Sequence, residues 1–287
     1  MNVTWLALFP IKGCRGITVD RARVSAYGLE GDREWQLVDA AGDFVTQRRR
    51  PDMVRIQPQI VEGGIVLTAE GRADLHVPTP TATNTTAKHY TGESPMADAG
   101  DEVAAWLTEL LGEPLRMVGI APGYVRDVGL FATESNLGDA APVLVVNEAS
   151  HRFLAERAVE PFGIDRWRGN IVVDHDQAFV EDTWRTLRIG DVTVTLVYPW
   201  PRCAVPQVEQ ATGERMREPA LVLKKHRWCT RVDTEDGIAK AILPGNALFG
   251  MGGAALPVGA TISVGDEVEA LDTAPALLPF PITNVVE

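Results

Sequence analysis

Residues 192–203 have the sequence VTVTLVYPWPRC, which begins like a β-strand and ends in a cysteine. Its first seven residues alternate between more and less apolar side chains, the period-two pattern of a strand that buries one face. Pro199 and Pro201 restrict the backbone and remove two N–H donors, so we expect a stiff loop here rather than a continuing strand. Because loops held by rigid strands often carry chemistry, Cys203 becomes the first candidate functional residue.

Similar short runs, punctuated by glycine and proline, recur on both sides of this segment. The expected strands lie at 3–9, 34–39, 53–60, 64–68, 72–77, 116–120, 143–146, 170–174, 185–188 and 261–270. Helical periodicity is expected at 100–111, 148–158 and 218–226. We expect Gly112 to end the first helix, Asn147 to cap the second, and the polar residues 78–98 to form a linker. The sequence therefore predicts a β-dominated α+β fold in two lobes, with a few helices.

The composition and charge of the chain exclude several classes of protein. Of the 287 residues, 45% are hydrophobic and 23% are charged, which is enough for a core. The net charge of −12 argues against a nucleic-acid binder, because phosphate neutralisation requires a basic excess. We expect no membrane partner, since neither a membrane-spanning apolar run nor a signal peptide is found. Three cysteines without a C-x-x-C pair favour the reducing cytoplasm.

The acidic excess is uneven along the chain. Residues 1–60 contain nine Lys and Arg against seven Asp and Glu, whereas the rest contains 18 basic and 32 acidic side chains. The two parts carry +2 and −14, which sum to −12. A locally basic segment in an acidic protein indicates a small anionic ligand. In the arginine run that begins with Arg48, two interpretations of Arg49 and Arg50 are equally good: they bind this ligand, or they form a solvated turn before Pro51.

The chemistry of Cys203 has several possible forms. The neighbouring Arg202 guanidinium favours a thiolate, which can act as a nucleophile, a redox thiol or a ligand for a soft metal. A buried structural thiol and a hydrolase dyad with His226 are also compatible with the sequence. No dinucleotide-binding, P-loop, H-E-x-x-H or G-x-S-x-G motif occurs. None of the five histidines lies four residues from another, which disfavours a zinc site.

Three further cations lie beside glycine, where a loop is expected to meet a strand. Lys12 occurs in FPIKGCRG, Arg33 in GLEGDREW, and Arg168 in RWRGN, which ends at Asn170. Glycine lets a ligand approach the backbone, and arginine suits bidentate contact with phosphate or carboxylate. Together with a loop thiolate, these residues indicate a bulky anion that is bound through sulfur at one end.

In their order along the chain, these motifs resemble a known family. The first part contains FPIKGCRG, GLEGDREWQLVD and FVTQRRRPDM. The second part contains GDEVAAWL, WRGNIVVD, EDTW, IGDV, PRC with VEQATG, LFG and ISVGDEVEAL. The chain is thereby similar to MOSC-domain proteins with a MOSC N-terminal β-barrel, the family of the mitochondrial amidoxime-reducing component. The resemblance implies a small β-barrel-like domain at 1–90, a MOSC β-barrel domain at 91–275 and a tail at 276–287.

The resemblance also implies a molybdenum cofactor, in which molybdenum binds the dithiolene of a phosphorylated pterin. Cys203 falls on the family's cysteine that ligates molybdenum, and Asp139, in GDAAP, matches the family's aspartate-x-x-proline turn. The resemblance assigns cofactor binding to Lys12, Arg33, Asp139, Arg168, Asn170 and Cys203, and we add Arg202 because it adjoins Cys203.

The implied reaction removes oxygen from a small N-hydroxylated substrate such as an amidoxime, a hydroxylamine or an N-hydroxylated base analogue. Because neither an NAD fingerprint nor iron–sulfur cysteine spacing is found, we expect a separate flavin or iron–sulfur reductase to return the electrons. A second possibility is a carrier of persulfide sulfur or of the molybdenum cofactor, with Cys203 as the transfer thiol. A third is an anion-binding domain that holds pyridoxal phosphate through Lys224 or Lys225.

Two segments depart from the family pattern near the expected substrate entrance. The threonine pair and aspartate that often follow the cysteine are replaced by Pro206, Gln207 and Glu209. Glu209 keeps a carboxylate with a longer reach, and it either acts as a catalytic proton donor or stabilises the loop. The family's FG motif continues as Met251-Gly252-Gly253, without the polar or aromatic side chains often found there. Both departures concern substrate range more than cofactor binding.

Overall fold

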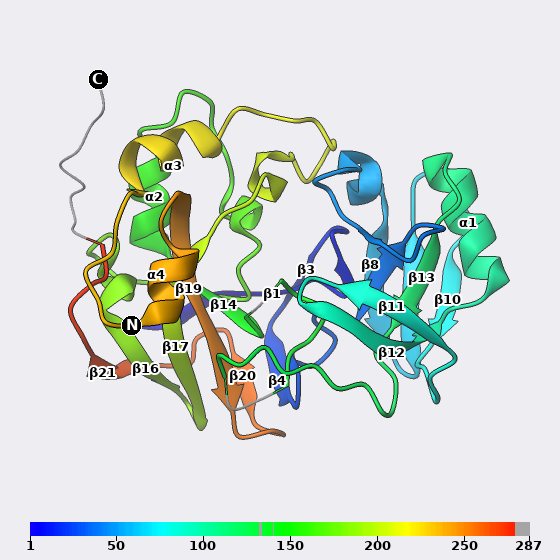
Figure 1. The fold of residues 1–287 in the computed structure, drawn as a ribbon, viewed down its shortest axis with the longest axis horizontal. Coiled ribbons are helices and arrows are strands. Elements are labelled where there is room, and N and C mark those ends of the chain that lie inside the picture. The colour runs from blue at the N-terminus through cyan, green and yellow to red at the C-terminus, as the bar shows by residue number, and fades with distance from the viewer. Residues whose placement is uncertain (132–133, 140, 279–287) are drawn as a thin grey trace.

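The computed structural model describes residues 1–131, 134–139 and 141–278, and Figure 1 shows them arranged in two β-rich lobes. The larger lobe is built on a nine-stranded sheet. In spatial order its strands are β21 (Val268–Thr273), β16 (Trp184–Ile189), β17 (Val192–Pro201), β19 (Asn246–Leu256), β14 (Val143–Asn147), β15 (Ile171–Val173), β1 (Val3–Leu8) and β3 (Ile17–Val19), with β18 (Trp228–Cys229) paired to β19. An isolated bridge between Asn2 and Glu267 joins the starts of β1 and β21, so the sheet curls back on itself. The predicted β-dominated fold is confirmed.

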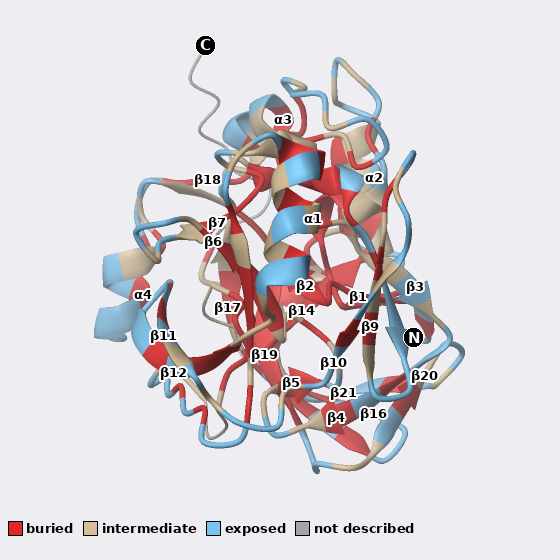
Figure 2. Cartoon of the chain, turned by 90° about the vertical axis from the view of Figure 1, so that its right-hand side faces the viewer, coloured by how far each residue is buried: buried red, intermediate tan, exposed pale blue. Residues whose placement is uncertain are grey.

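The smaller lobe packs two sheets against one helix. The first sheet contains β11 (Thr85–His89), β12 (Gly92–Asp98), β13 (Arg116–Gly119), β6 (Trp35–Val38) and β2 (Ile11–Lys12), with β7 (Phe44–Val45) paired to β6. The second contains β10 (Leu75–Pro78), β9 (Gly64–Thr68) and β8 (Gln57–Val61). Helix α1 (Asp101–Leu111) buries one face in the core of this lobe and leaves the other exposed (Figure 2). It ends at Gly112, whose left-handed conformation closes the helix as predicted.

The first 29 residues connect the two lobes. Strands β1 and β3 belong to the large sheet, whereas β2, which lies between them in the sequence, belongs to the smaller lobe. Strand β4 (Arg21–Ser25) pairs with β5 (Gly28–Leu29) and with β20 (Thr261–Ser263) from the far end of the chain. The chain thus crosses between the lobes repeatedly, and these crossings bring Lys12 and Arg33 close to residues of the larger lobe.

Short helices complete the larger lobe. They are α2 (Glu148–Ala155), α3 (Ala220–His226), α4 (Gly237–Ile242) and the 3-10 turns η2 (Ile164–Trp167), η3 (Val180–Thr183) and η4 (Val205–Gln207). Helices α2 and α3 pack on the large sheet through Leu154, Val222 and Leu223. The side chain of Asn147 accepts a hydrogen bond from Ala149 N–H at 3.0 Å, so it caps α2 as predicted. In the smaller lobe, the strand expected from residue 53 begins as the 3-10 turn η1 (Pro51–Arg55).

The expectation that the proline segment forms a loop is wrong. Strand β17 continues through Pro199 to Pro201 and stays paired with β19. The register shifts between Leu196 and Tyr198 and again between Pro199 and Pro201. Because a ladder is interrupted at such irregularities, residues without an N–H donor are tolerated there. The large sheet therefore extends almost to Cys203.

The expected linker at residues 78–98 instead contains the β11–β12 hairpin. Buried positions alternate with exposed ones along both strands, at Ala87 and His89 in β11 and at Ser94 and Met96 in β12. Two of these four side chains are polar, so hydropathy alone does not reveal the period-two pattern. The hairpin extends the first sheet of the smaller lobe.

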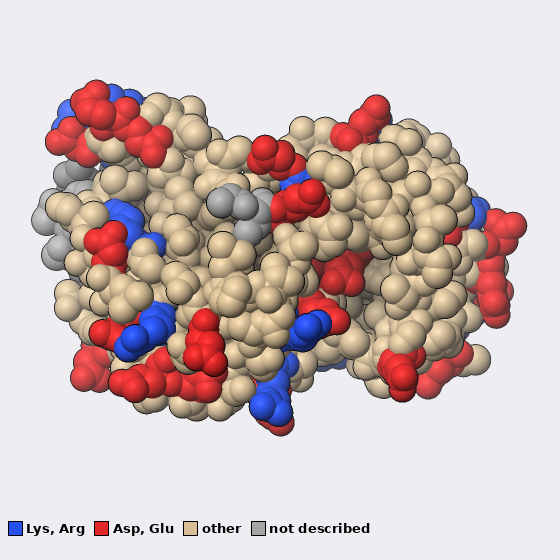
Figure 3. All heavy atoms as spheres, turned by 90° about the horizontal axis from the view of Figure 1, so that it is seen from below, with Lys and Arg blue, Asp and Glu red and all other residues tan. Residues whose placement is uncertain are grey.

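Acidic side chains are spread widely over the lower face of the molecule, and the basic ones are fewer there (Figure 3). This surface agrees with the formal net charge of −12. Within the described ranges, no helix is both long and apolar enough to cross a membrane.

Candidate functional site

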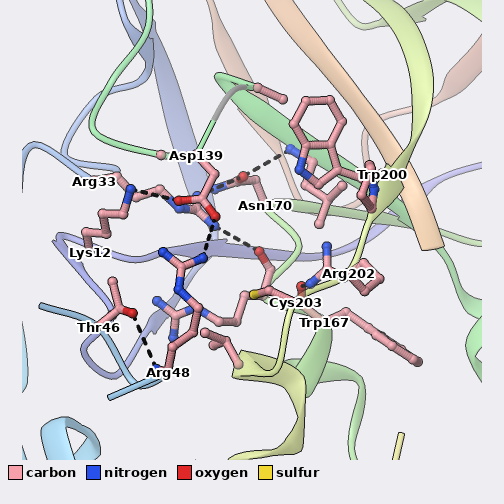
Figure 4. A pocket seen from close by; sticks show the side chains of 17 residues that line it. Lys12, Arg33, Thr46, Arg48, Asp139, Trp167, Asn170, Trp200, Arg202 and Cys203 are labelled. Carbon is pink, nitrogen blue, oxygen red and sulfur yellow. Dashed lines mark hydrogen bonds and ion pairs between the residues drawn. The ribbon is translucent and has the colours of Figure 1, made fainter. Parts of the chain in front are cut away.

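A pocket at the junction of the two lobes gathers the predicted residues (Figure 4). It opens to solvent and combines charged, polar and aromatic side chains, as small-molecule and cofactor sites commonly do. Every predicted site residue except Glu209 lines it: Lys12, Arg33, Asp139, Arg168, Asn170, Arg202 and Cys203. Lys12 and Cys203 therefore share one cavity although they are 191 positions apart in the sequence.

Asp139 lies between two cations of the smaller lobe. Its Oδ1 is 2.8 Å from Lys12 Nζ, and its Oδ2 is 3.1 Å from Arg48 Nη1. Burial lowers the pKa of Lys12 to about 8 although Asp139 opposes the shift, so Lys12 still carries its charge at neutral pH. Burial by itself would raise the pKa of Asp139. The positive charges of Lys12 and Arg48 outweigh this effect and hold the pKa of the carboxyl far below its usual range. Asp139 is therefore an anion that neutralises part of the cationic wall.

Arg33 connects the smaller lobe to the loop before β15. Its Nη1 donates to Asn170 Oδ1 at 3.2 Å, and its Nη2 donates to the carbonyl of Arg168 at 3.1 Å. The same Asn170 oxygen accepts from Leu144 N–H at 3.1 Å, which ties the loop to β14. Arg33 and Arg168 both have positive φ, at 51° and 54°. Non-glycine residues adopt this conformation rarely, and where they do it often serves a site.

Arg168 is a buried cation at the base of the pocket. Its Nη1 donates to the carbonyl of Cys14 at 2.8 Å, and its guanidinium lies 4.2 Å from the centre of the Phe9 ring. Burial, together with the charge of Arg33, lowers the pKa of Arg168 to about 9. The guanidinium groups of Arg33 and Arg168 both lie over the Phe9 ring. Among the described residues Arg33 pairs with Asp32 and Arg168 forms no ion pair, so the two groups favour binding of an anion.

Cys203 presents the exposed thiol of the protein at the end of β17. The other two cysteines, Cys14 and Cys229, are buried, and burial raises the pKa of both thiols, that of Cys14 to about 12. The backbone before Cys203 is fixed, because Arg202 N–H donates to the carbonyl of Ala247 at 2.8 Å. Figure 4 shows the sulfur of Cys203 between the side chains of Arg48 and Arg202. A thiol in this setting can ligate a soft metal or carry sulfur.

Arg202 also has unused hydrogen-bonding capacity. Its Nη2 donates to the carbonyl of Trp167 at 2.6 Å, whereas its buried Nε has no hydrogen-bond partner among the described residues. Burial lowers the pKa of Arg202 to about 10, although Cys203 opposes the shift. Buried polar atoms are normally paired, so this donor is free for a ligand of the pocket. With the neighbouring thiol and cations, it fits an anionic cofactor that carries a soft metal.

Glu209 lies outside the pocket lining. Its Oε2 is 3.1 Å from Nη1 of Arg166. Arg166 also donates to the carbonyls of Pro206 at 2.6 Å and Glu218 at 2.9 Å. This guanidinium therefore joins both ends of the segment that follows Cys203. The geometry favours a loop-stabilising role for Glu209 over that of a proton donor.

The pocket includes residues to which the sequence analysis gave no role in the site. Arg48 belongs to the arginine run of the locally basic segment, but it was not named there as a contact of the ligand. In the structure Arg49 pairs with Asp39 and Glu113 away from the pocket, and Arg50 pairs with Asp52 and Glu113. The other unpredicted lining residues are Gly13, Thr46, Gly138, Ala141, Leu144, Trp167, Trp200, Pro201 and Val205. The tryptophans and small residues gave no sequence signal, because such residues are equally common in cores.

Two family models match this chain. Residues 1–114 match the MOSC N-terminal beta barrel domain, and residues 132–269 match the MOSC domain. The mitochondrial amidoxime reducing component 2 of Bos taurus is 31% identical over 93% of this chain and 82% of its own length. The mitochondrial amidoxime-reducing component 1 of Homo sapiens is 31% identical over 94% and 83%. The molybdenum cofactor sulfurase of Danio rerio is 29% identical over 79% of this chain but only 30% of its own length.

Proposed function

The chain belongs to the family that joins a MOSC N-terminal beta barrel domain to a MOSC domain, and we propose that it is a molybdenum-cofactor-dependent reductase of small N-hydroxylated compounds. Its relatives are named for amidoxime reduction and for the molybdenum cofactor. The observation that carries the proposal is the exposed Cys203 thiol in a pocket whose other wall is cationic.

Several residues of the chain would bind the anionic parts of the cofactor, and one residue would bind the molybdenum. Lys12, Arg33 and Arg168 would bind the anionic parts of the cofactor, and the free Nε–H of Arg202 would donate to it. Cys203 would bind molybdenum through its sulfur. Asp139 and Asn170 would set the positions of these side chains through the contacts described above.

The cofactor would supply the redox centre that removes oxygen from an N–OH group. The overall reaction converts N–OH, two electrons and two protons into N–H and water. A separate flavin or iron–sulfur reductase would deliver the electrons, because no C-x-x-C pair or dinucleotide motif occurs in the chain. Glu209 would act as a positioning residue, since its carboxylate pairs with Arg166 rather than facing the pocket. A cytoplasmic location belongs to the same proposal.

Protein purified from a host that makes the cofactor tests this function. We expect one molybdenum per chain and reduction of benzamidoxime with an artificial electron donor, and we expect Cys203→Ala to lose both. Cys229→Ala is the matched control, because Cys229 is buried in a different cluster outside the pocket. Stoichiometric molybdenum without turnover would remove the enzymatic role.

A second function, transfer of sulfur, is supported by the similarity to molybdenum cofactor sulfurases and by the accessibility of Cys203. In that case Cys203 would carry a persulfide. Mass spectrometry of the intact protein separates the two functions. A one-sulfur increase on Cys203 in protein that contains no molybdenum would favour the carrier.

A further inference from the structure

One wall of the pocket is aromatic and lies across the cavity from Lys12 and Arg48 (Figure 4). Two tryptophans form it, but they differ in what they offer to a ligand. Trp167 is fully buried, stacks on Phe249 with 3.9 Å between ring centres, and is held by its Nε1 hydrogen bond to His151. The Trp167 ring is therefore packed in the core and offers little surface to a ligand. Trp200 is only partly buried and also lines the pocket.

The position of Trp200 is fixed by its neighbours. It is the penultimate residue of β17, between Pro199 and Pro201, which restrict the backbone on either side. Its six-membered ring lies against Gly252 of β19, where an added Cβ would come within 2.2 Å of Trp200 Cε3. Glycine at 252 thus makes room for the indole. The ring is held in place before a ligand arrives, which lowers the entropic cost of stacking.

The position of Trp200 relative to the Cys203 thiol allows its indole ring to contact a bound substrate. It precedes Cys203 by three residues, and both side chains line the same cavity. Indole rings stack on planar conjugated groups and give an aliphatic group no comparable contact. A substrate whose N–OH group approaches the site of Cys203 would therefore lay the rest of its structure beside this ring.

We propose that Trp200 is a specificity-determining residue that selects substrates whose N-hydroxylated group is attached to a planar conjugated system. Aromatic amidoximes and N-hydroxylated heteroaromatic bases belong to this class, whereas aliphatic amidoximes do not. The inference rests on the proposed reductase function. It adds the residue that distinguishes aromatic from aliphatic members of that substrate class.

A comparison of benzamidoxime with acetamidoxime tests this selection, because both carry the same reacting group. Calorimetric titration of the cofactor-loaded protein without electron donor measures affinity in the absence of turnover. We expect Trp200→Leu to weaken benzamidoxime binding at least about fivefold, equivalent to about 1 kcal/mol, and to change acetamidoxime binding less than twofold. Trp200→Phe should retain most of the preference. Trp228→Leu, at a partly exposed tryptophan outside the pocket lining, is the matched control and should behave as wild type.

Gly252→Ala provides a second test that leaves the indole in the protein. The added methyl group would displace the Trp200 ring, so we expect the same loss of preference as in Trp200→Leu. Molybdenum content measured beside affinity shows that the cofactor is retained in each variant. Equal weakening of both ligands, no weakening of either, or a wild-type protein that binds neither would overturn the inference. If the wild type binds benzamidoxime selectively but does not reduce it, the proposed function fails while the role of Trp200 stands.

Discussion

Arg48 shows how the site depends on single side chains. Three arginines follow one another, but only Arg48 reaches the pocket, where its Nη1 lies 3.1 Å from Asp139. Burial would lower the pKa of this guanidinium, but Asp139 and Cys203 outweigh it and raise the pKa. Arg49 forms its ion pairs outside the pocket. The smaller lobe thus places a positive charge beside the thiol of the larger lobe.

Replacement of Arg48 tests its contribution to ligand binding. Arg48→Gln removes one charge from the cationic wall, so we expect about tenfold weaker retention of molybdenum and pterin after dialysis, the effect of one charge-assisted hydrogen bond. Both contents are measured per chain in the purified protein. Arg49→Gln is the control and should retain the wild-type content. Equal retention in the two variants would show that Arg48 does not take part in binding.

Among the elements, β17 connects the sheet to the site. Its pairs with β19 at Pro199 and Pro201 lie on either side of Trp200. The last pair, Pro201 with Leu248, fixes the backbone just before Arg202 and Cys203. The alternation from Val192 onward was enough to predict the strand. Its continuation through the prolines was not predictable, because it depends on irregularities in the register with a strand about 50 residues later in the sequence.

The segment after Cys203 is the second element that shapes the site. The Glu209 carboxylate is about one-third exposed but pairs with the buried Arg166, and glutamine keeps an oxygen acceptor there. We therefore expect Glu209→Gln to reduce stability by about 1 to 2 kcal/mol. We expect the kcat for benzamidoxime to fall less than tenfold. Thermal unfolding and steady-state kinetics provide the two measurements. A fall of kcat by a factor of about a hundred or more would instead indicate a proton donor.

The sequence was most informative where local pattern determines structure. The apolar face of α1, its end at Gly112 and the Asn147 cap follow from residues close together in the chain. The β11–β12 hairpin was missed because polar side chains such as Ser94 occupy its buried positions. The grouping of Lys12, Arg168 and Cys203 around one anion followed from their shared chemistry and was made specific by the family resemblance, since no local pattern brings such distant residues together.

At the scale of the whole molecule, the site exists because two lobes meet. The smaller lobe contributes Lys12 and Arg48, and the larger lobe contributes Arg168, Arg202 and Cys203. The hydrogen bonds of Arg33 to Asn170 and to the Arg168 carbonyl cross this junction. Separation of the lobes would therefore take Lys12 and Arg48 away from the thiol, whereas Arg168 and Arg202 would stay beside it.

A buried acidic cluster in the larger lobe affects the stability of the whole protein. Glu181 accepts a hydrogen bond from Asn147 Nδ2 at 2.9 Å, while the adjacent Asp182 pairs with Arg227 at 2.7 Å. Burial, reinforced by the charge of Asp182, raises the pKa of Glu181. Because the folded state then holds this proton at a pH where the unfolded chain has released it, stability falls as pH rises from about 4.5 through the raised pKa.

Replacing the ionisable Glu181 should weaken the fall in unfolding free energy as the pH rises. Glu181→Gln keeps a hydrogen-bond acceptor for Asn147 but cannot ionise. Between pH 5 and pH 8 we expect the variant to gain roughly 1 kcal/mol of unfolding free energy relative to wild type. Denaturant unfolding at the two pH values measures this difference. Parallel pH profiles for the two proteins would show that Glu181 does not titrate in this range.

The central claim is that the sulfur of Cys203 binds molybdenum while cations from both lobes hold the rest of the cofactor. X-ray absorption at the molybdenum edge tests it most directly, because it counts the sulfur atoms bound to the metal. We predict that Cys203→Ser either loses molybdenum or shows one sulfur ligand fewer than the wild type, whereas Cys229→Ser matches the wild type. Wild-type molybdenum content and wild-type sulfur coordination in Cys203→Ser would contradict the claim.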